Sequence, residues 1–175
     1  MNEVAVSAHA LLVDDDAGIR KAYPRLLKRL GCETVTASDG REAIALLAGQ
    51  SFDVILTDIR MPNMDGIEFL RKVRETDLDV PVIIITGSPE IDSALKAVEY
   101  GAFLYLKKPI EIDVLGDAIN RALSLHKMAR LKRQALELIG IKGMNLGDRA
   151  ALETRFRSAL DQLTMAYQPI VNAMQ

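Results

Sequence analysis

Acidic, hydroxyl and lysine side chains follow four separate apolar runs of this chain, and together they could carry out phosphoryl transfer. Asp14 and Asp15 come directly after ALLV, and Asp58 comes directly after DVILT. Thr86 closes VPVIIIT, and Lys108 stands just beyond FLYL. A carboxylate can act as the nucleophile, while a lysine and a hydroxyl can bind phosphoryl oxygens. This chemistry requires a fold that brings the five side chains together.

The carboxylates also indicate a metal ion. Carboxylates that converge on one site repel each other unless a cation joins them. Around Asp14, Asp15 and Asp58 the sequence offers oxygen ligands and no neighbouring His or Cys, which favours Mg²⁺ over Zn²⁺. The sequence therefore predicts Mg²⁺ as the cofactor.

Five short runs rich in Val, Ile, Leu or Thr are typical of β-strands. The runs at 53–57 and 80–86 are apolar almost throughout, as in a parallel sheet covered on both faces. We expect strands at 10–13, 33–37, 53–57, 80–86 and 103–106.

Amphipathic stretches of helical period separate and follow these runs, and Gly31, Gly49 and Gly101 end three of them. Five strand–helix units in series predict an α/β fold, with a doubly wound five-stranded parallel sheet and a C-terminal helical extension. Ligands bind at the carboxyl ends of the strands in such sheets, and the candidate residues stand at those ends.

Residues 9–126 resemble the receiver domain of two-component response regulators, the flavodoxin-like (CheY-like) family. The stretches that carry the resemblance are LLVDDD, TDIRMPNMDG, ITGS and YLKKP, in the family's order and at its spacing. The resemblance implies a signalling module, not an enzyme, in which Asp58 accepts a phosphoryl group from a sensor histidine kinase.

The resemblance also assigns ligands for Mg²⁺. It implies that Asp15, Asp58 and the backbone carbonyl of Arg60 bind the ion directly, and that Asp14 assists through water. Asp16 completes the DDD run, and we interpret it as the N-cap of the first helix, with metal binding as the alternative.

Thr86 and Lys108 would hold the phosphoryl oxygens, and Tyr105 matches the family's switch aromatic, which turns inward with Thr86. Such a switch is a two-state element biased by a local change of charge. Plain core packing is the alternative for Tyr105. Pro109 would fix the backbone after Lys108, through a cis bond if the turn requires one. Lys107 is expected to be solvated.

Other polar residues receive no chemical role from their neighbours in sequence. We interpret His9 and His126 as structural, since neither neighbours another ligand-like residue. The resemblance does imply a role for Arg60 and Ser88, which stand at positions that vary in the family and tune how fast the phosphate is lost.

The bulk composition of the 175 residues describes a globular protein that we expect to be cytoplasmic. The single Cys32 excludes an internal disulfide, and no apolar run is long enough to span a membrane. Residues 1–126 hold fourteen basic against twenty acidic side chains, and residues 127–175 hold eight against four. An acidic body with a basic tail suggests two units of different purpose.

The last helix of the receiver is expected to continue into a linker over 127–147. Its apolar residues repeat at the 3-4-3 spacing of a short coiled coil, namely Met128, Leu131, Ala135 and Leu138. We expect a homodimer through this seam or through a face of the receiver. A helix packed on its own receiver domain is the alternative.

Residues 148–175 predict an output domain that is cut short. Asp148 can cap an amphipathic helix that leads into YQPIV, beginning at Tyr167. This segment resembles the opening of EAL-type cyclic-di-GMP phosphodiesterase domains, without the EAL triplet or the acidic ligands that would follow. The alternative is an output that binds DNA or protein, although the segment has no recognition-helix pattern and we expect no nucleic acid binding by this fragment.

Overall fold

A five-stranded parallel sheet forms the centre of the chain, with strand order β2-β1-β3-β4-β5. The computed structural model describes residues 8–138, with side chains through residue 135. The strands are β1 (Ala8–Val13), β2 (Cys32–Ala37), β3 (Val54–Thr57), β4 (Val82–Thr86) and β5 (Leu104–Lys107). Every neighbouring pair is parallel, which confirms the expected fold class.

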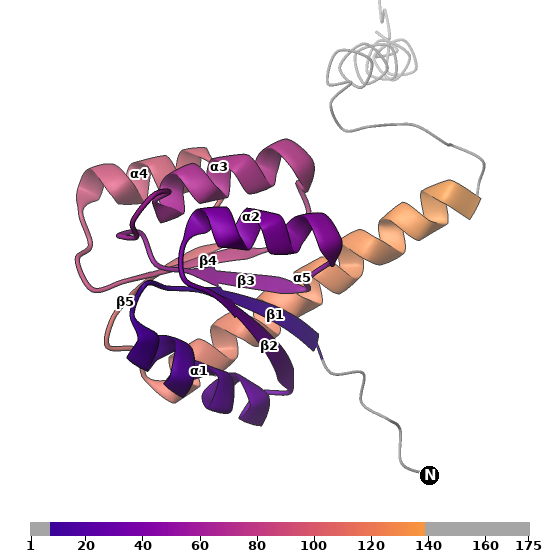
Figure 1. Ribbon diagram of the computed structural model, residues 1–175. Coiled ribbons are helices and arrows are strands. Elements are labelled where there is room, and N and C mark those ends of the chain that lie inside the picture. Colours follow the sequence, from indigo (N-terminus) through magenta and orange to yellow (C-terminus); the bar gives the residue numbers. More distant parts are fainter. Residues whose placement is uncertain (1–7, 139–175) are drawn as a thin grey trace, which may run out of the picture. The chain divides into compact units, whose positions relative to one another are not determined.

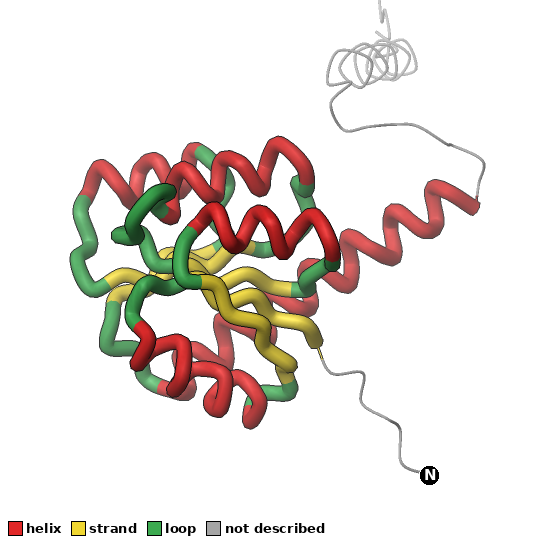
Figure 2. The backbone as a smooth tube through the Cα atoms, viewed as in Figure 1, coloured by secondary structure: helices red, strands yellow, loops and turns green. Residues whose placement is uncertain are grey.

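Helices cover both faces of the sheet (Figures 1 and 2), with α2, α3 and α4 on one face and α1 and α5 on the other. The helices are α1 (Ala17–Arg29), α2 (Gly40–Gly49), α3 (Gly66–Thr76), α4 (Ile91–Glu99) and α5 (Ile112–Leu138). This arrangement explains why β3 and β4 are buried throughout.

An aspartate starts each of the first three helices. Asp16, Asp39 and Asp65 each accept two backbone N–H groups from the first turn of α1, α2 and α3. Such caps satisfy amides that have no partner within the helix. Asp16 is therefore the N-cap of α1, as predicted, and it fixes where that helix begins beside the acidic run.

The two faces of the sheet carry separate hydrophobic clusters. Leu11, Ile55 and Ile84 contribute to the cluster under α2, α3 and α4, which includes Phe69 of α3. Leu115 of α5 belongs to the opposite cluster. Each large apolar side chain buried in this way contributes about 1.5 to 3 kcal/mol. The core fixes the strand ends from which the candidate residues extend.

The apolar stripe of α4 departs from the usual relation between periodicity and burial. The stripe marks the helix correctly, yet Ile91, Leu95 and Val98 are 80%, 63% and 74% exposed. The buried residue of this helix is the small Ala97. The large apolar residues of α4 therefore face away from the sheet, and the small Ala97 faces it.

Helix α5 runs without a break to Leu138, in agreement with the expected continuation past residue 126. Met128 and Leu131 are 69% and 55% exposed. Ala135 lies on the same helix, and the side chain of Leu138 and the segment 139–175 lie outside the described residues. The boundaries 9–126, 127–147 and 148–175 stay predictions. Within 8–138 no helix is long and apolar enough to cross a membrane.

Candidate functional site

The carboxyl edge of the sheet brings together the residues singled out in the sequence. Asp14 and Asp15 follow β1, and Asp58 follows β3, which pairs directly with β1. Thr86 ends β4, and Lys108 comes directly after β5. Because all five strands are parallel, these ends share one edge of the sheet.

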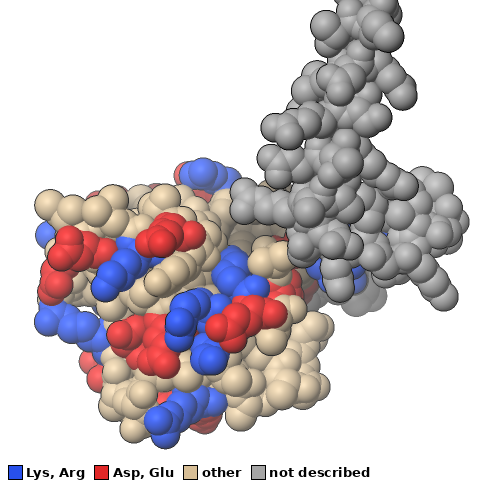
Figure 3. Space-filling view, turned by 90° about the horizontal axis from the view of Figure 1, so that it is seen from above, with Lys and Arg blue, Asp and Glu red and all other residues tan. Residues whose placement is uncertain are grey.

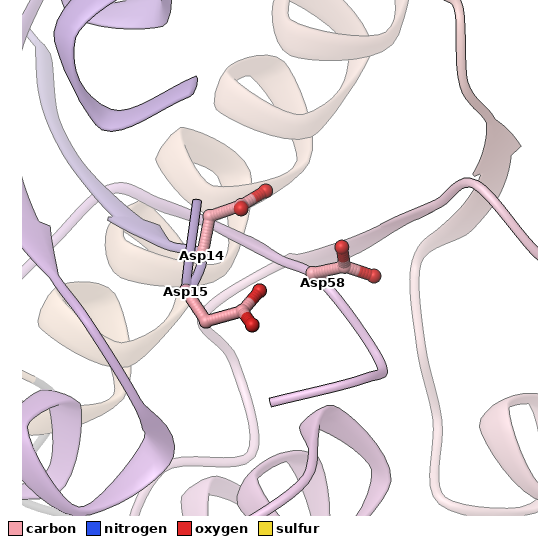
Figure 4. A group of neighbouring side chains, drawn as sticks. All are labelled: Asp14, Asp15 and Asp58. Atoms are coloured by element: carbon pink, nitrogen blue, oxygen red, sulfur yellow. The ribbon is translucent and has the colours of Figure 1, made fainter. Parts of the chain in front are cut away.

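Three carboxylates form a close cluster at this edge (Figure 4). One oxygen each from Asp14, Asp15 and Asp58 lies within 4.8 Å of the others. Asp14 is buried, Asp58 is partly buried and Asp15 is exposed. The cluster therefore has a buried floor and an open side.

Lys108 is the cation that compensates the buried part of this cluster. Its Nζ donates to Asp14 Oδ2 at 2.6 Å and to Asp58 Oδ2 at 2.7 Å. Burial acts to lower the pKa of Lys108, but the hydrogen bonds and charges of Asp14 and Asp58 outweigh it, and the pKa is raised. Lys108 is therefore charged at neutral pH, and one ammonium group serves two carboxylates.

Backbone and side-chain contacts hold the acids in place. Asp14 Oδ1 accepts the amide of Asp16, and the carbonyl of Asp14 accepts Arg20 Nη1 at 2.6 Å. Asp58 Oδ1 accepts the amide of Ile59 at 2.6 Å. The second oxygen of each of these two acids is the one that meets Lys108. The two side chains are thus oriented before any ligand arrives.

The turn after β5 sets the position of Lys108. The Lys108–Pro109 peptide bond is cis, the possibility raised by X-Pro in the sequence. The amide of Lys108 donates to the carbonyl of Thr86 at 2.8 Å, which joins the ends of β4 and β5. Lys107 is exposed, as expected.

Thr86 and Tyr105 lie on the neighbouring strands β4 and β5. Thr86 is 1% exposed, and its Oγ1 accepts the amide of Ser88 at 3.2 Å. Tyr105 is partly buried, and its hydroxyl lies 3.0 Å from Ser93 Oγ on α4. The sequence named both residues as switch candidates but gave no sign of Ser93, whose contact depends on how α4 packs.

The donor set fits a hard dication. Within residues 8–138 the cluster of Asp14, Asp15 and Asp58 offers carboxylate oxygens only, which suits Mg²⁺. Arg60 is exposed, and it follows Asp58 by two residues in the loop that leads to α3. Three carboxylates against one Lys leave a surplus of negative charge that a dication would neutralise.

A second charged cluster, at the opposite edge of the sheet, could not be anticipated from sequence neighbours. His126 Nδ1 lies 3.3 Å from Asp53 Oδ1, and Arg130 Nη1 lies 3.4 Å from the same oxygen. The amide of His9 donates to Asp53 Oδ2 at 2.9 Å. These contacts give His126 a partner and fit its interpretation as structural.

Acidic and basic side chains lie interspersed on the face of the described residues shown in Figure 3. On that face they form no broad patch of a single sign. Binding to nucleic acid relies on clustered basic residues. The distribution on this face gives no such cluster.

Comparison with known proteins identifies the family. The model of the response regulator receiver domain matches residues 10–120. A receiver domain from Clostridium thermocellum is 35% identical, with a TM-score of 0.67 over 70% of this chain and 98% of that one. The chemotaxis response regulator CheY4 of Vibrio cholerae is 34% identical, with a TM-score of 0.63 over 67% and 100%. This chain belongs to the response regulator receiver domain family.

Curated relatives place such a domain within longer proteins. The DNA-binding transcriptional regulator NtrC of Salmonella typhimurium is 37% identical over 146 residues, 83% of this chain and 31% of NtrC. The regulatory protein AtoC of Escherichia coli is 40% identical over 120 residues, 69% of this chain and 26% of AtoC. The chain thus spans about a third or less of the length of these relatives. Residues 10–120 form the receiver domain of a two-component response regulator, and such a domain is a non-catalytic switch module of a kind that sensor histidine kinases phosphorylate.

Proposed function

We propose that Asp58 is the phosphoryl acceptor of this receiver domain and that phosphorylation requires Mg²⁺. The observation that carries the proposal is the convergence of three carboxylates and one lysine. Asp14, Asp15 and Asp58 offer oxygens within 4.8 Å of each other, and Lys108 bonds to two of these residues. Receiver domains generally bind Mg²⁺ at such an acidic pocket.

Asp58 has the geometry of a nucleophile that is held but still reachable. Its side chain is 13% exposed, and the Ile59 amide fixes one carboxylate oxygen. An Asp58 oxygen forms the new P–O bond while the P–N bond of the phosphohistidine breaks, and the leaving imidazole takes a proton from solvent. The anhydride carries the phosphoryl group with no other change in the protein's covalent structure.

The other residues of the site would bind the Mg²⁺ ion or the phosphoryl group. Asp14, Asp15, Asp58 and the carbonyl of Arg60 would hold the ion, with Asp14 acting through water. When bound, Mg²⁺ would neutralise charge that develops on the phosphoryl oxygens. Lys108, at 2.7 Å from Asp58, is within reach of a phosphoryl group on that side chain.

Thr86 and Tyr105 supply the switch in this proposal. Thr86 would donate its hydroxyl hydrogen to a phosphoryl oxygen, a role left open by its present contact, in which Oγ1 only accepts the Ser88 amide. Tyr105 would turn inward into the space that Thr86 leaves, and the contact between its hydroxyl and Ser93 would then break. The change would reach α4, where Ser93 lies.

Helix α5 is the route from the switch to an output domain. Met128 and Leu131 are exposed on this helix at heptad spacing, which supports pairing with a second copy. The proposed homodimer uses this seam, continued by Ala135 and Leu138, or a face of the receiver.

Two outputs have separate support. The segment 148–175, with YQPIV near its end, supports a cyclic-di-GMP phosphodiesterase domain of EAL type. The similarity to NtrC, which is named as a DNA-binding transcriptional regulator, supports the alternative of a DNA-binding output. Cyclic-di-GMP hydrolysis and operator binding by the intact protein, each with and without phosphorylation, distinguish the two.

The receiver chemistry is tested by intact mass after incubation with acetyl phosphate. We expect one added phosphate in the presence of Mg²⁺ and none after chelation with EDTA. Addition of phosphate that is equally fast in EDTA would refute the metal requirement. Absence of any adduct, in a protein whose circular dichroism shows the native fold, would refute the acceptor chemistry.

A further inference from the structure

The loop between Asp58 and α3 contains a tight turn centred on Asn63. Asn63 has a φ of 64°, and the Met64 amide donates to the Pro62 carbonyl at 2.7 Å. A bond between residues two apart around a positive φ defines a γ-turn of the rarer and more strained kind. Asn tolerates a positive φ better than most residues, but the conformation still needs support from its surroundings.

Asp39 supplies that support from a distant part of the chain. Asn63 Nδ2 donates to Asp39 Oδ2 at 2.7 Å, across 24 residues of sequence. The other oxygen of Asp39 accepts the amides of Arg41 and Glu42 and thereby caps α2. One carboxylate thus holds both the start of α2 and the γ-turn.

The side chain next to the turn packs on the same helix start. A Cβ on Gly40 would lie 2.7 Å from Met64 Cγ and 2.8 Å from its Sδ, so a larger residue there would require the Met64 side chain to move. At the base of the loop, the Gly66 amide donates to the Ile59 carbonyl at 2.8 Å. The loop is therefore fastened at its base by Ile59 and Gly66 and at its tip by Asn63 and Met64.

Because the loop is held at its base and at its tip, only the short segment between these contacts can change conformation when the Asn63 turn moves. The Ile59 carbonyl is bound at the base, while the ring of Pro62 fixes its φ and its carbonyl is held within the turn. Arg60 and Met61 lie between these points. Met61 is partly buried against the cluster under α2, α3 and α4, so a shift of the Asn63 turn is taken up most easily at the exposed Arg60, the residue whose carbonyl is proposed to bind Mg²⁺.

We propose that Asn63, held by Asp39, is a positioning residue for the divalent cation site. The pair fixes the path of the loop and therefore the place of the Arg60 carbonyl relative to the three carboxylates. This inference rests on the proposed function, because it takes the Arg60 carbonyl as a ligand. It adds that the hydrogen bond between Asn63 and Asp39 links the start of α2 to the metal site.

A reversal of donor and acceptor tests the pair. Asp39→Asn still caps α2, since Asn is a good N-cap, and the Asn63 amide can flip to offer its oxygen to the new donor, so this variant alone keeps a hydrogen bond. Asn63→Asp still tolerates a positive φ but opposes two carboxylates. The double variant Asp39→Asn/Asn63→Asp restores one donor and one acceptor with polarity reversed, and it keeps the wild-type net charge.

The readout is the Mg²⁺ dissociation constant of the unphosphorylated full chain, measured by titration calorimetry. We expect Asn63→Asp to raise it about fivefold, and both Asp39→Asn and the double variant to stay within about twofold of wild type. General electrostatics predicts the opposite for Asn63→Asp, because an added negative charge should tighten binding of a dication. An Asn63→Asp variant that binds Mg²⁺ like wild type would overturn the proposal.

A control on the same helix separates the tether from a general loosening of α2. Glu42 accepts the amide and hydroxyl of Ser38 near the start of this helix. Glu42→Gln weakens these bonds without touching the loop and should leave the Mg²⁺ dissociation constant unchanged. A rise as large as that of Asn63→Asp would assign the effect to the helix and refute the positioning role.

A measurement without metal completes the test. Amide hydrogen exchange of Met64 and Gly66 in the metal-free protein should be faster in Asn63→Asp and restored in the double variant. If exchange follows this pattern while wild type binds no Mg²⁺, the tether stands and the proposed function fails. If exchange does not change in Asn63→Asp, the tether is refuted whatever the protein binds.

Discussion

Strand β3 has an aspartate at each end, and the two ends use their carboxylates differently. Asp53 precedes the strand and Asp58 follows it, so the two lie on opposite edges of the same sheet. Both meet basic side chains supplied by later parts of the chain. The two ends of β3 differ in how many acidic and how many basic side chains meet there.

At the Asp53 edge, one carboxylate is surrounded by donors. His126 and Arg130 of α5 lie near Oδ1, and the amide of His9 donates to Oδ2. The acid therefore has as many partners as it needs, and it ties α5 to the start of β3. Such an edge has no charge left for a ligand to neutralise.

At the Asp58 edge, the acids outnumber the base. Lys108 is shared by Asp14 and Asp58, while Asp15 lies in the same cluster without an ion pair among the described residues. Stability alone would not collect three carboxylates around one ammonium group. An edge that is short of positive charge marks a place for a cation, whereas a balanced edge marks a structural contact.

The largest contrast between the edges is expected in phosphorylation. Asp58→Asn should abolish incorporation of phosphate from acetyl phosphate, because an amide oxygen cannot replace the carboxylate nucleophile. Asp53→Asn makes the same change at the other end of β3 and should retain full incorporation. Intact mass with Mg²⁺ measures both, and an adduct on Asp58→Asn would move the acceptor to another residue.

The second contrast concerns the loss of the shared cation. Lys108→Met leaves the buried Asp14 and the partly buried Asp58 without their cationic partner, which should lower the free energy of unfolding by about 2 to 3 kcal/mol in metal-free buffer. Mg²⁺ should restore part of this loss, since a dication can replace the missing charge. Urea unfolding with and without Mg²⁺ measures both effects, and the exposed Lys107→Met is the control that should change little.

The same ion pairs predict an alkaline transition. The pKa of Lys108 is raised above its ordinary value of 10.5, so its contribution is fully present below that pH and is lost as the pH rises through the raised pKa. The stability difference between wild type and Lys108→Met should therefore be constant from pH 8 to about 10 and shrink above about 10.5. A difference that shrinks at neutral pH would contradict these ion pairs.

The third contrast is the stability of the Asp53 edge. Asp53→Asn keeps an acceptor for the His9 amide but removes the charge that faces His126 and Arg130. We expect a loss of about 1 kcal/mol in the free energy of unfolding, with no dependence on Mg²⁺. Asp117→Asn, on the exposed side of α5, is the control, and an equal loss there would show that the Asp53 contacts contribute nothing specific.

The Asp58 edge could be predicted from the sequence and the Asp53 edge could not, for a physical reason. Asp14, Asp58, Thr86 and Lys108 each close or follow an apolar run, and parallel strands bring such positions to one edge. Asp53 lies beside a strand too, but its partner Arg130 is 77 residues away in the middle of a long helix. That contact depends on the rotation of α5 about its axis, which periodicity does not determine.

The orientation of helix α4 and the role of the Asn63 turn also depend on contacts that local sequence patterns do not determine. The periodicity of Ile91, Leu95 and Val98 predicts a helix, but which side faces the sheet depends on how closely the helix can pack. MPNMDG predicts a turn, but the role of Asn63 appears only when its φ and its contact with Asp39 are known. Local pattern determines the elements, whereas contacts between distant elements depend on packing.

The smallest expected effect is the change in the free energy of unfolding when Asp15 is neutralised. It should have the opposite sign to the change expected at Asp53. Asp15→Asn removes one of three like charges, so it should raise the free energy of unfolding of the metal-free protein by about 0.5 kcal/mol, where Asp53→Asn lowers it. Asp15→Asn should also lose most of the stabilisation that Mg²⁺ gives to wild type. Asp16→Asn removes a neighbouring charge but keeps the N-cap of α1, so its response to Mg²⁺ should match wild type. Equal responses of the two variants to Mg²⁺ would show that Asp15 has no special place in the ion's site, and the surplus of charge at this edge would then have to be explained without it.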